Sequence, residues 1–133
     1  MDSKIINWQE VLGWGKDQVD DIKFFAFSYL KQGKYEIALK LFLGLKVLVP
    51  EDSYVIKTLG SLYLVTNQPE IALEYLNRST EIEPKNSRVK LNIVQALLDS
   101  GQREEAIKKA KSLVKVREKA IAGKAKALIM AWG

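Results

Sequence analysis

Apolar and polar positions along this chain repeat together with a period of 34 residues. The segment GKYEIA at 33–38 recurs as NQPEIA at 67–72 and again as GQREEA at 101–106. Within each copy the apolar residues return every three or four positions, which is the spacing of one face of a helix. A fixed period of this length indicates stacked supersecondary units. We therefore predict three units, each made of two helices.

A small residue recurs in one phase of the repeat, where a larger side chain would push two helices apart. These residues are Ala38, Ala72 and Ala106. A second set of residues suits the left-handed turn that ends a helix, namely Gly33, Asn67 and Gly101. Each first helix should therefore end at this turn, just before the helix that carries the small residue.

The second helix of a unit should end before a proline, since Pro50 and Pro84 are 34 residues apart. The pairs Asp52-Ser53 and Asn86-Ser87 then provide N-caps for the next helix. The expected helix ranges are 17–31, 35–48, 53–66, 69–82, 87–99 and 103–117.

These features make the chain resemble a tetratricopeptide repeat protein. The resemblance implies an all-α fold, a helix-turn-helix solenoid of three repeats at 19–52, 53–86 and 87–120. A short N-terminal helix within 1–18 and a C-terminal capping segment at 121–133 would complete a single domain.

The two ends of the chain are less regular than the repeats. Residues 3–14 suggest a short amphipathic helix with Ser3 as its cap and Ile5 on its apolar side. At the other end, an apolar stripe that continues to Trp132 favours one long helix over 103–131. The alternative is a break near 117–119, followed by a separate capping helix.

Two tryptophans in the N-terminal segment are unsuited to full exposure. We favour packing of Trp8 and Trp14 against the first repeat. The alternative is that they form a second surface for a protein partner.

Charge is concentrated at the C-terminal end, where 101–133 carries nine basic residues and three acids. Such a segment could contact nucleic acid or anionic lipid. Its lysines are interleaved with apolar residues at helical spacing and lack the aromatic residues that stack on bases. We therefore favour a solvated helix face and expect no nucleic-acid partner.

Composition excludes several classes of protein. The chain has no Cys and no His, which removes disulfides, thiolate chemistry and the commonest metal ligand. It has no Gly-rich phosphate loop, and its acidic pairs sit at helix starts, where they offset the helix dipole. We expect no enzyme, cofactor or metal. The absence of a secretion signal and of a long apolar run predicts a cytoplasmic protein with no membrane span.

The family resemblance implies that the first helices of the repeats line a concave groove. Members that grip the acidic C-terminus of heat-shock chaperones do so with a Lys, Asn and Arg clamp. At those positions this chain keeps Lys23 but has Phe27 and Thr58, so the clamp is not expected. A groove with an apolar floor fits an amphipathic helix or an extended apolar peptide instead. The predicted binding residues are Lys23, Phe24, Phe27, Leu30, Tyr54, Lys57, Leu64, Val65, Arg88, Leu91, Gln95 and Leu98.

A narrower resemblance runs through GKYEIALKLFLGLKVLVPEDSYVIKTLGSLYL at 33–64. It is similar to the small three-repeat chaperones of bacterial type III secretion, on the residues Gly33, Tyr35, Ala38, Phe42, Leu45, Asp52, Leu59 and Gly60. The resemblance implies a cytoplasmic bacterial chaperone that keeps a translocator or needle subunit soluble before export. A second small co-chaperone and a homodimer are further partners that it allows. The alternative is a structural scaffold or assembly factor whose groove is filled by its own termini.

Overall fold

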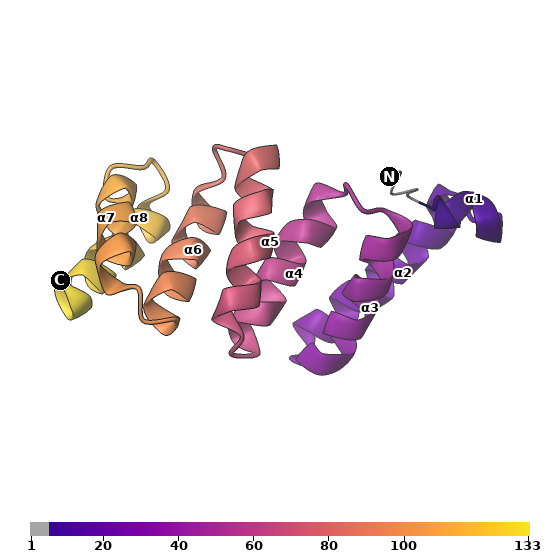
Figure 1. Cartoon of the computed structure of the whole chain (residues 1–133), viewed down its shortest axis with the longest axis horizontal. Coiled ribbons are helices and arrows are strands. Elements are labelled where there is room, and N and C mark those ends of the chain that lie inside the picture. The colour runs from indigo at the N-terminus through magenta and orange to yellow at the C-terminus, as the bar shows by residue number, and fades with distance from the viewer. Residues whose placement is uncertain (1–5) are drawn as a thin grey trace, which may run out of the picture.

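The chain forms a row of helices in which each helix from α2 onward packs against the next, and α1 packs against α3 (Figure 1). The computed structural model describes residues 6–133. Figure 1 shows the first and the last of the described helices at opposite ends of the row. The helices are α1 (Trp8–Leu12), α2 (Lys16–Lys31), α3 (Tyr35–Leu48), α4 (Ser53–Val65), α5 (Pro69–Ile82), α6 (Ser87–Asp99), α7 (Arg103–Leu113) and α8 (Lys119–Trp132).

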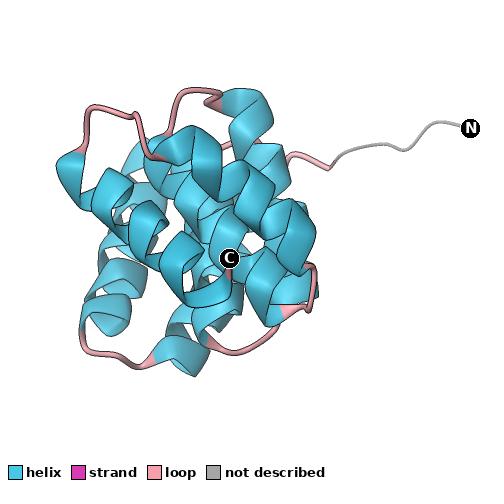
Figure 2. Cartoon of the chain, turned by 90° about the vertical axis from the view of Figure 1, so that its left-hand side faces the viewer, coloured by secondary structure: helices cyan, strands magenta, loops and turns pink. Residues whose placement is uncertain are grey.

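The described residues contain helices and short loops only, as Figure 2 shows in a view from the C-terminal end. The all-α fold predicted from the sequence is therefore confirmed. The helices α2 to α6 begin and end within one residue of their predicted bounds. Among residues 6–133, no helix is long and apolar enough to cross a membrane.

The turns inside the repeats follow the predicted left-handed conformation. Gly33, Asn67 and Gly101 have φ angles of 76°, 62° and 81°. In each turn the backbone N–H of the next residue donates to a carbonyl of the preceding helix, as Lys34 does to Tyr29 at 3.0 Å. This bond satisfies one of the carbonyls that the end of a helix leaves free.

Side-chain caps start α4 and α6, as the sequence predicted. The carboxylate of Asp52 accepts from the backbone N–H of Val55 at 3.0 Å, and Asn86 accepts from that of Val89 at 3.1 Å. Pro69 occupies the first turn of α5, where its missing N–H leaves no hydrogen bond unmade.

Small residues let the helices approach closely. Ala38, Ala72 and Ala106 are fully buried. Gly60 on α4 has even less room, because a Cβ atom built there would lie 2.7 Å from Cδ2 of Leu76 on α5. The α4–α5 crossing thus depends on a residue without a side chain.

The core consists of two hydrophobic clusters. The first joins α2, α3 and α4 around the fully buried Phe42 and Leu59, and the second joins α5, α6, α7 and α8 around Leu76 and Val94. Tyr63 packs against both clusters and stacks on Tyr75, with ring centroids 5.5 Å apart. The two halves of the row therefore meet at the α4–α5 pair.

The N-terminal helix is shorter than predicted. The chain is not helical at Ile6 and Asn7, and α1 has only five residues. Asn7 caps it by accepting from the N–H of Glu10 at 3.1 Å, and Gly13 ends it with a φ of 68°. The predicted cap Ser3 and apolar Ile5 lie outside the described residues.

The favoured long helix over 103–131 is wrong, and the alternative with a break is correct. Helix α7 ends at Leu113 and α8 begins at Lys119. The β-branched Val114 and Val116 in the break have lower helix propensity than their neighbours. The turn also lets α8 fold back on α6 and α7 and bury Ile121. Burial of this face outweighs continuation of one helix.

Candidate functional site

The helices α2, α4 and α6 form the surface that contains the predicted binding residues, here called the first-helix face. The backbones of α4 and α6 approach closely. By contrast, no Cα atom of α2 lies within 8 Å of one in α4, among the helices that the structure describes. The backbones of α2 and α4 are thus farther apart than those of α4 and α6, although both helices contribute side chains to the first core cluster.

Apolar side chains are most exposed at the α2 end of the first-helix face. Phe24 and Phe27 on α2 are 67% and 43% exposed, and Val65 at the end of α4 is 54% exposed. Large apolar side chains are usually buried in a chain of this size, so this exposure indicates a contact surface.

The other predicted apolar residues are covered to differing extents. Leu30, Tyr54, Leu64 and Leu91 are half-buried and pack against the two core clusters. Leu98 is only 7% exposed and belongs to the second cluster, so its prediction as an exposed groove residue is wrong. Helix α8 contacts α6, which adds packing that the repeat pattern does not specify.

Phe25 was missing from the predicted site although it is 58% exposed. Its ring lies edge-on to that of Phe24, with centroids 5.8 Å apart. The signal for it was the run DQVDDIKFFAFSYL, which has more apolar residues than one buried helix face requires. Three phenylalanines of α2 are therefore accessible.

The lysines of the first-helix face are paired within the chain. Lys23 Nζ lies 2.6 Å from Oδ2 of Asp52, and Lys57 Nζ lies 3.4 Å from Oε1 of Glu83. Lys23 is the one residue that matches the clamp by which related proteins grip a carboxylate. In this chain its ammonium group pairs with Asp52.

Asp52 is held in its ionised form by this contact. Burial by itself raises the pKa of its carboxyl group. The hydrogen bonds from Lys23 and from the backbone N–H of Val55, together with the charge of Lys23, outweigh burial and leave the pKa below its ordinary value of 3.8. The ion pair is thus a fixed part of the link between α2 and α4.

The α6 end of the first-helix face is polar. Arg88 is exposed, Gln95 donates to Oδ1 of Asp99 at 2.9 Å, and Asn92 lies 3.4 Å from the hydroxyl of Ser61. The first-helix face therefore changes from apolar on α2 to polar on α6.

A second apolar surface lies between α1, α2 and α3. It is a pocket of about 530 Å³ with almost entirely apolar walls. Trp8 and Trp14 line it and remain 38% exposed, so they lie against the first repeat without being buried. Its other lining residues are Leu12, Ile22, Lys40, Leu41, Gly44, Val47 and Leu48.

The ends of the described chain do not cover the exposed phenylalanines. Helix α1 packs on α3, and α8 packs on α6 and α7. Within residues 6–133, no group of three or more acidic side chains is arranged to hold a metal ion.

Comparisons with known proteins agree with this architecture. Residues 58–86 match the family model described as tetratricopeptide repeat. The chain is also 31% identical over 100 residues to Protein CTR9 homolog of Arabidopsis thaliana. That match covers 68% of this chain but only 9% of the plant protein, so the chain corresponds to a small part of it.

Solved structures of similar fold cover most of the chain. PcrH of Pseudomonas aeruginosa, in complex with the chaperone binding region of PopD, has a TM-score of 0.79 and 21% identity over 90% of this chain and 93% of PcrH. The type III secretion chaperone SycD of Yersinia enterocolitica, in complex with a peptide of the translocator YopD, has a TM-score of 0.78 and 24% identity over 88% and 93%. A further SycD structure, described as an alternative dimer, has a TM-score of 0.76 and 24% identity over 88% and 92%.

Proposed function

We propose that this tetratricopeptide-repeat chain acts by binding protein and not by catalysis, and that its partner docks on the first-helix face. The observation that carries the proposal is the exposure of Phe24 and Phe27 on α2, with Val65 on α4. Two proteins of similar fold are in complex with polypeptide segments, PcrH with the chaperone binding region of PopD and SycD with a peptide of the translocator YopD, which supports a polypeptide as the partner.

The finer proposal is a chaperone of bacterial type III secretion that works in the cytoplasm. It would hold a translocator or needle subunit by an apolar segment and keep that segment from aggregating before export. A dimer, or a second small protein over the pocket of Trp8 and Trp14, is compatible with this role.

The chemistry of the first-helix face defines the client segment. Its apolar anchors would lie on α2, and its polar residues would lie toward α6, near Arg88 and Gln95. Burial of a large apolar side chain contributes about 1.5–3 kcal/mol. Two or three anchors would thus give measurable affinity after the cost of ordering the segment. An amphipathic helix or an extended peptide with clustered apolar residues meets this description.

The test compares three forms of the tagged protein expressed in its native host. Phe27→Glu places a charge among the proposed anchors, and Ile37→Glu is the matched control on α3, since Ile37 is 47% exposed. Proteins retained by each form are identified by mass spectrometry, and the affinity of a purified client is then measured. We expect the client to be retained by the unaltered chain and by Ile37→Glu but lost from Phe27→Glu, whose helicity should be unchanged.

Retention of the same client by Phe27→Glu would remove the first-helix face as the binding surface. If the Phe27→Glu form binds the client as tightly as the unaltered chain, and binding is lost when salt is added, the contact would belong to the basic C-terminal helices instead.

A second candidate function is a scaffold within a larger assembly. The similarity to a short part of Protein CTR9 homolog favours it. A scaffold would hold a folded partner, so the partner would fail to bind as an isolated peptide. Measuring affinity for peptides cut from the identified partner therefore separates the two functions.

A further inference from the structure

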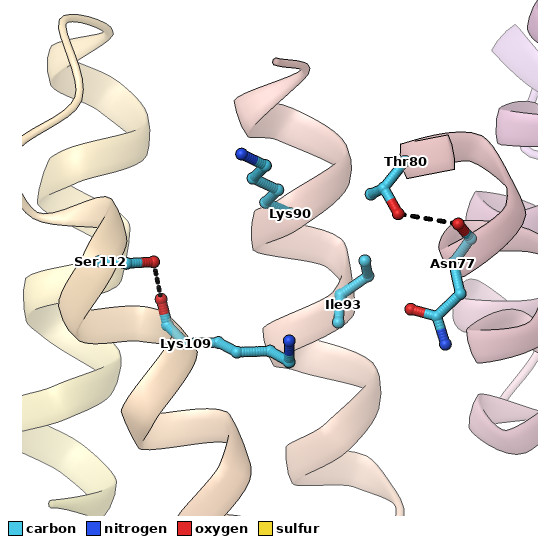
Figure 3. Close-up of a pocket in the computed structure, with 6 residues that line it drawn as sticks. All are labelled: Asn77, Thr80, Lys90, Ile93, Lys109 and Ser112. Atoms are coloured by element: carbon cyan, nitrogen blue, oxygen red, sulfur yellow. Dashed lines mark hydrogen bonds between the residues drawn. The ribbon is translucent and has the colours of Figure 1, made fainter. Parts of the chain in front are cut away.

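A polar groove lies between α5 and α7, with α6 as its floor (Figure 3). It has a volume of about 290 Å³. Figure 3 shows Lys90 of α6 and Lys109 of α7 on the side of α6 that faces α7, and Ile93 on the side that faces α5. The lining residues are Asn77, Thr80, Lys90, Ile93, Lys109 and Ser112.

The preceding crossing of the row, between α3 and α5, is filled by side chains. Lys46 of α3 donates to the hydroxyl of Tyr75 of α5 at 2.8 Å and lies 5.1 Å from the centre of its ring. Arg78 donates to the carbonyl of Pro50 at 3.0 Å and lies 3.1 Å from Oε1 of Glu51. Both cations of this crossing are therefore satisfied within the chain.

The same positions one repeat later hold different residues. A shift of 34 residues takes Lys46 to Thr80 and Tyr75 to Lys109, which removes the bridge. It also takes Arg78 to Ser112, Leu43 to Asn77, and the fully buried Ile56 to the exposed Lys90. Large side chains, and side chains that bond to each other, are replaced by short polar residues and by lysines, and the groove is the result.

The two hydroxyl groups of the groove are already hydrogen-bonded within the chain. Thr80 and Ser112 donate their hydroxyl protons to carbonyls of their own helices, those of Asn77 and Lys109, both at 2.7 Å. The two ammonium groups remain as donors toward the groove, and no carboxylate is among its lining residues.

The two lysines are available to a ligand. Within residues 6–133, Lys90 forms no ion pair or hydrogen bond through its ammonium group. Lys109 lies 3.6 Å from Oε2 of Glu105, in a pair whose side chains are about half exposed. An exposed pair of this kind, four residues apart on a helix, contributes little free energy and is readily exchanged for a better partner.

We propose that the groove between α5 and α7 binds a small tetrahedral oxyanion, the phosphoryl dianion, between Lys90 and Lys109. Two ammonium groups match the two charges of such a group. The volume holds the anion with a few waters or with a small organic group attached to it. This inference is independent of the client proposed for the first-helix face, because the two sites share helix α6 but no lining residue.

The test titrates the isotopically labelled full chain with inorganic phosphate at pH 7.5 and follows amide chemical shifts at constant ionic strength. Sulfate serves as a second tetrahedral dianion, and acetate as a planar monoanion. We expect saturable shifts at Thr80, Lys90 and Ser112 with phosphate and sulfate, and not with acetate.

Two variants and one control make the test decisive. Lys90→Ala with Lys109→Ala should weaken phosphate binding by about tenfold or more, since it removes two charged hydrogen bonds. Thr80→Lys with Lys109→Tyr keeps the net charge and rebuilds the bridge of the preceding crossing, so it should abolish binding. Lys108→Ala with Lys111→Ala removes the same charge from another part of α7 and should leave binding unchanged.

Equal weakening by the control pair, or unchanged binding in the bridged variant, would identify an adventitious ion only and overturn the proposal. Shifts that do not saturate would overturn it as well. Circular dichroism of each variant establishes that the helices are intact.

Discussion

At the scale of single residues, Gly60 marks the tightest approach of two helices. A methyl group there would lie 2.7 Å from Cδ2 and 2.8 Å from Cγ of the fully buried Leu76. Overpacking of this kind costs about 1–3 kcal/mol, whereas Ala gains about 1 kcal/mol over Gly in a helix interior. We therefore expect Gly60→Ala to lower the free energy of unfolding measured with urea.

Gly44 on α3 provides the matched control for Gly60. It also lies inside a helix, but a Cβ atom there would meet no other atom within 4 Å. Gly44→Ala should raise the free energy of unfolding by about 0.5–1 kcal/mol. A stabilising effect at both positions would show that the α4–α5 crossing can relax to admit a methyl group.

Residues whose role is local could be predicted from the sequence, and those set by distant packing could not. The left-handed turn at Asn67 and the cap at Asp52 depend on chemistry within a few residues. Leu98 is buried in the second cluster, to which α8 contributes Ala125 from outside the repeat pattern. The exposure of Phe25 depends on which side of α2 is left without a neighbouring helix.

At the scale of elements, Asp52 links two helices by starting α4 and pairing with Lys23 of α2. Asp52→Asn keeps a capping side chain but removes the charge. We expect it to lower the free energy of unfolding at pH 7 by about 1 kcal/mol. The pKa of Asp52 is lowered in the folded chain, so its stabilising effect is present above its unfolded pKa and is lost as the pH falls through the folded pKa.

The measurement is urea unfolding of both forms at several pH values from 7 to below 3.8. The difference between them should shrink toward zero at the acidic end. Asp20→Asn is the control, because the Lys16–Asp20 pair at 3.2 Å is largely exposed. A difference for Asp52→Asn that persists at low pH would attribute the effect to the cap and not to the charge.

Helix ends inside the repeats followed from the sequence, whereas the terminal elements did not. The periodic stripe that continues to Trp132 is equally compatible with one straight helix and with two helices packed together. Only the gain from burying Ile121, Ala122 and Ala125 beside α7 decides between them, and that is a tertiary effect.

At the scale of the whole molecule, each helix depends on its neighbours in the row. Helix α8 covers α6 and α7 and contributes Ala125 to the second cluster. A chain ending after residue 118 should therefore lose protection of the α7 amides from hydrogen exchange, with the first cluster much less affected. Removing residues 1–14 is the control and should leave α7 protected, since α1 contacts α3 alone among the described helices. Uniform loss of protection along the chain would mean that the row unfolds as a single unit.

The first-helix face was predicted in outline because the repeat pattern assigns residues to the first helices. Its uneven character was not predictable, because ion pairs such as Lys23–Asp52 and the separation of α2 from α4 depend on how the repeats are set against each other. The groove between α5 and α7 could not be predicted from the sequence either. It arises because the Lys46–Tyr75 contact of the preceding crossing has no counterpart there, and no sequence motif marks it.

The positions of the tryptophans make intrinsic fluorescence a probe of the two ends of the row. Trp8 and Trp14 lie at one end of the row and Trp132 at the other, and the chain has no fourth indole. Emission from the first two should report events near the pocket on α3, and emission from the last should report fraying of α8. Replacing Trp132 with Phe would leave fluorescence that monitors the N-terminal end alone, without any attached dye.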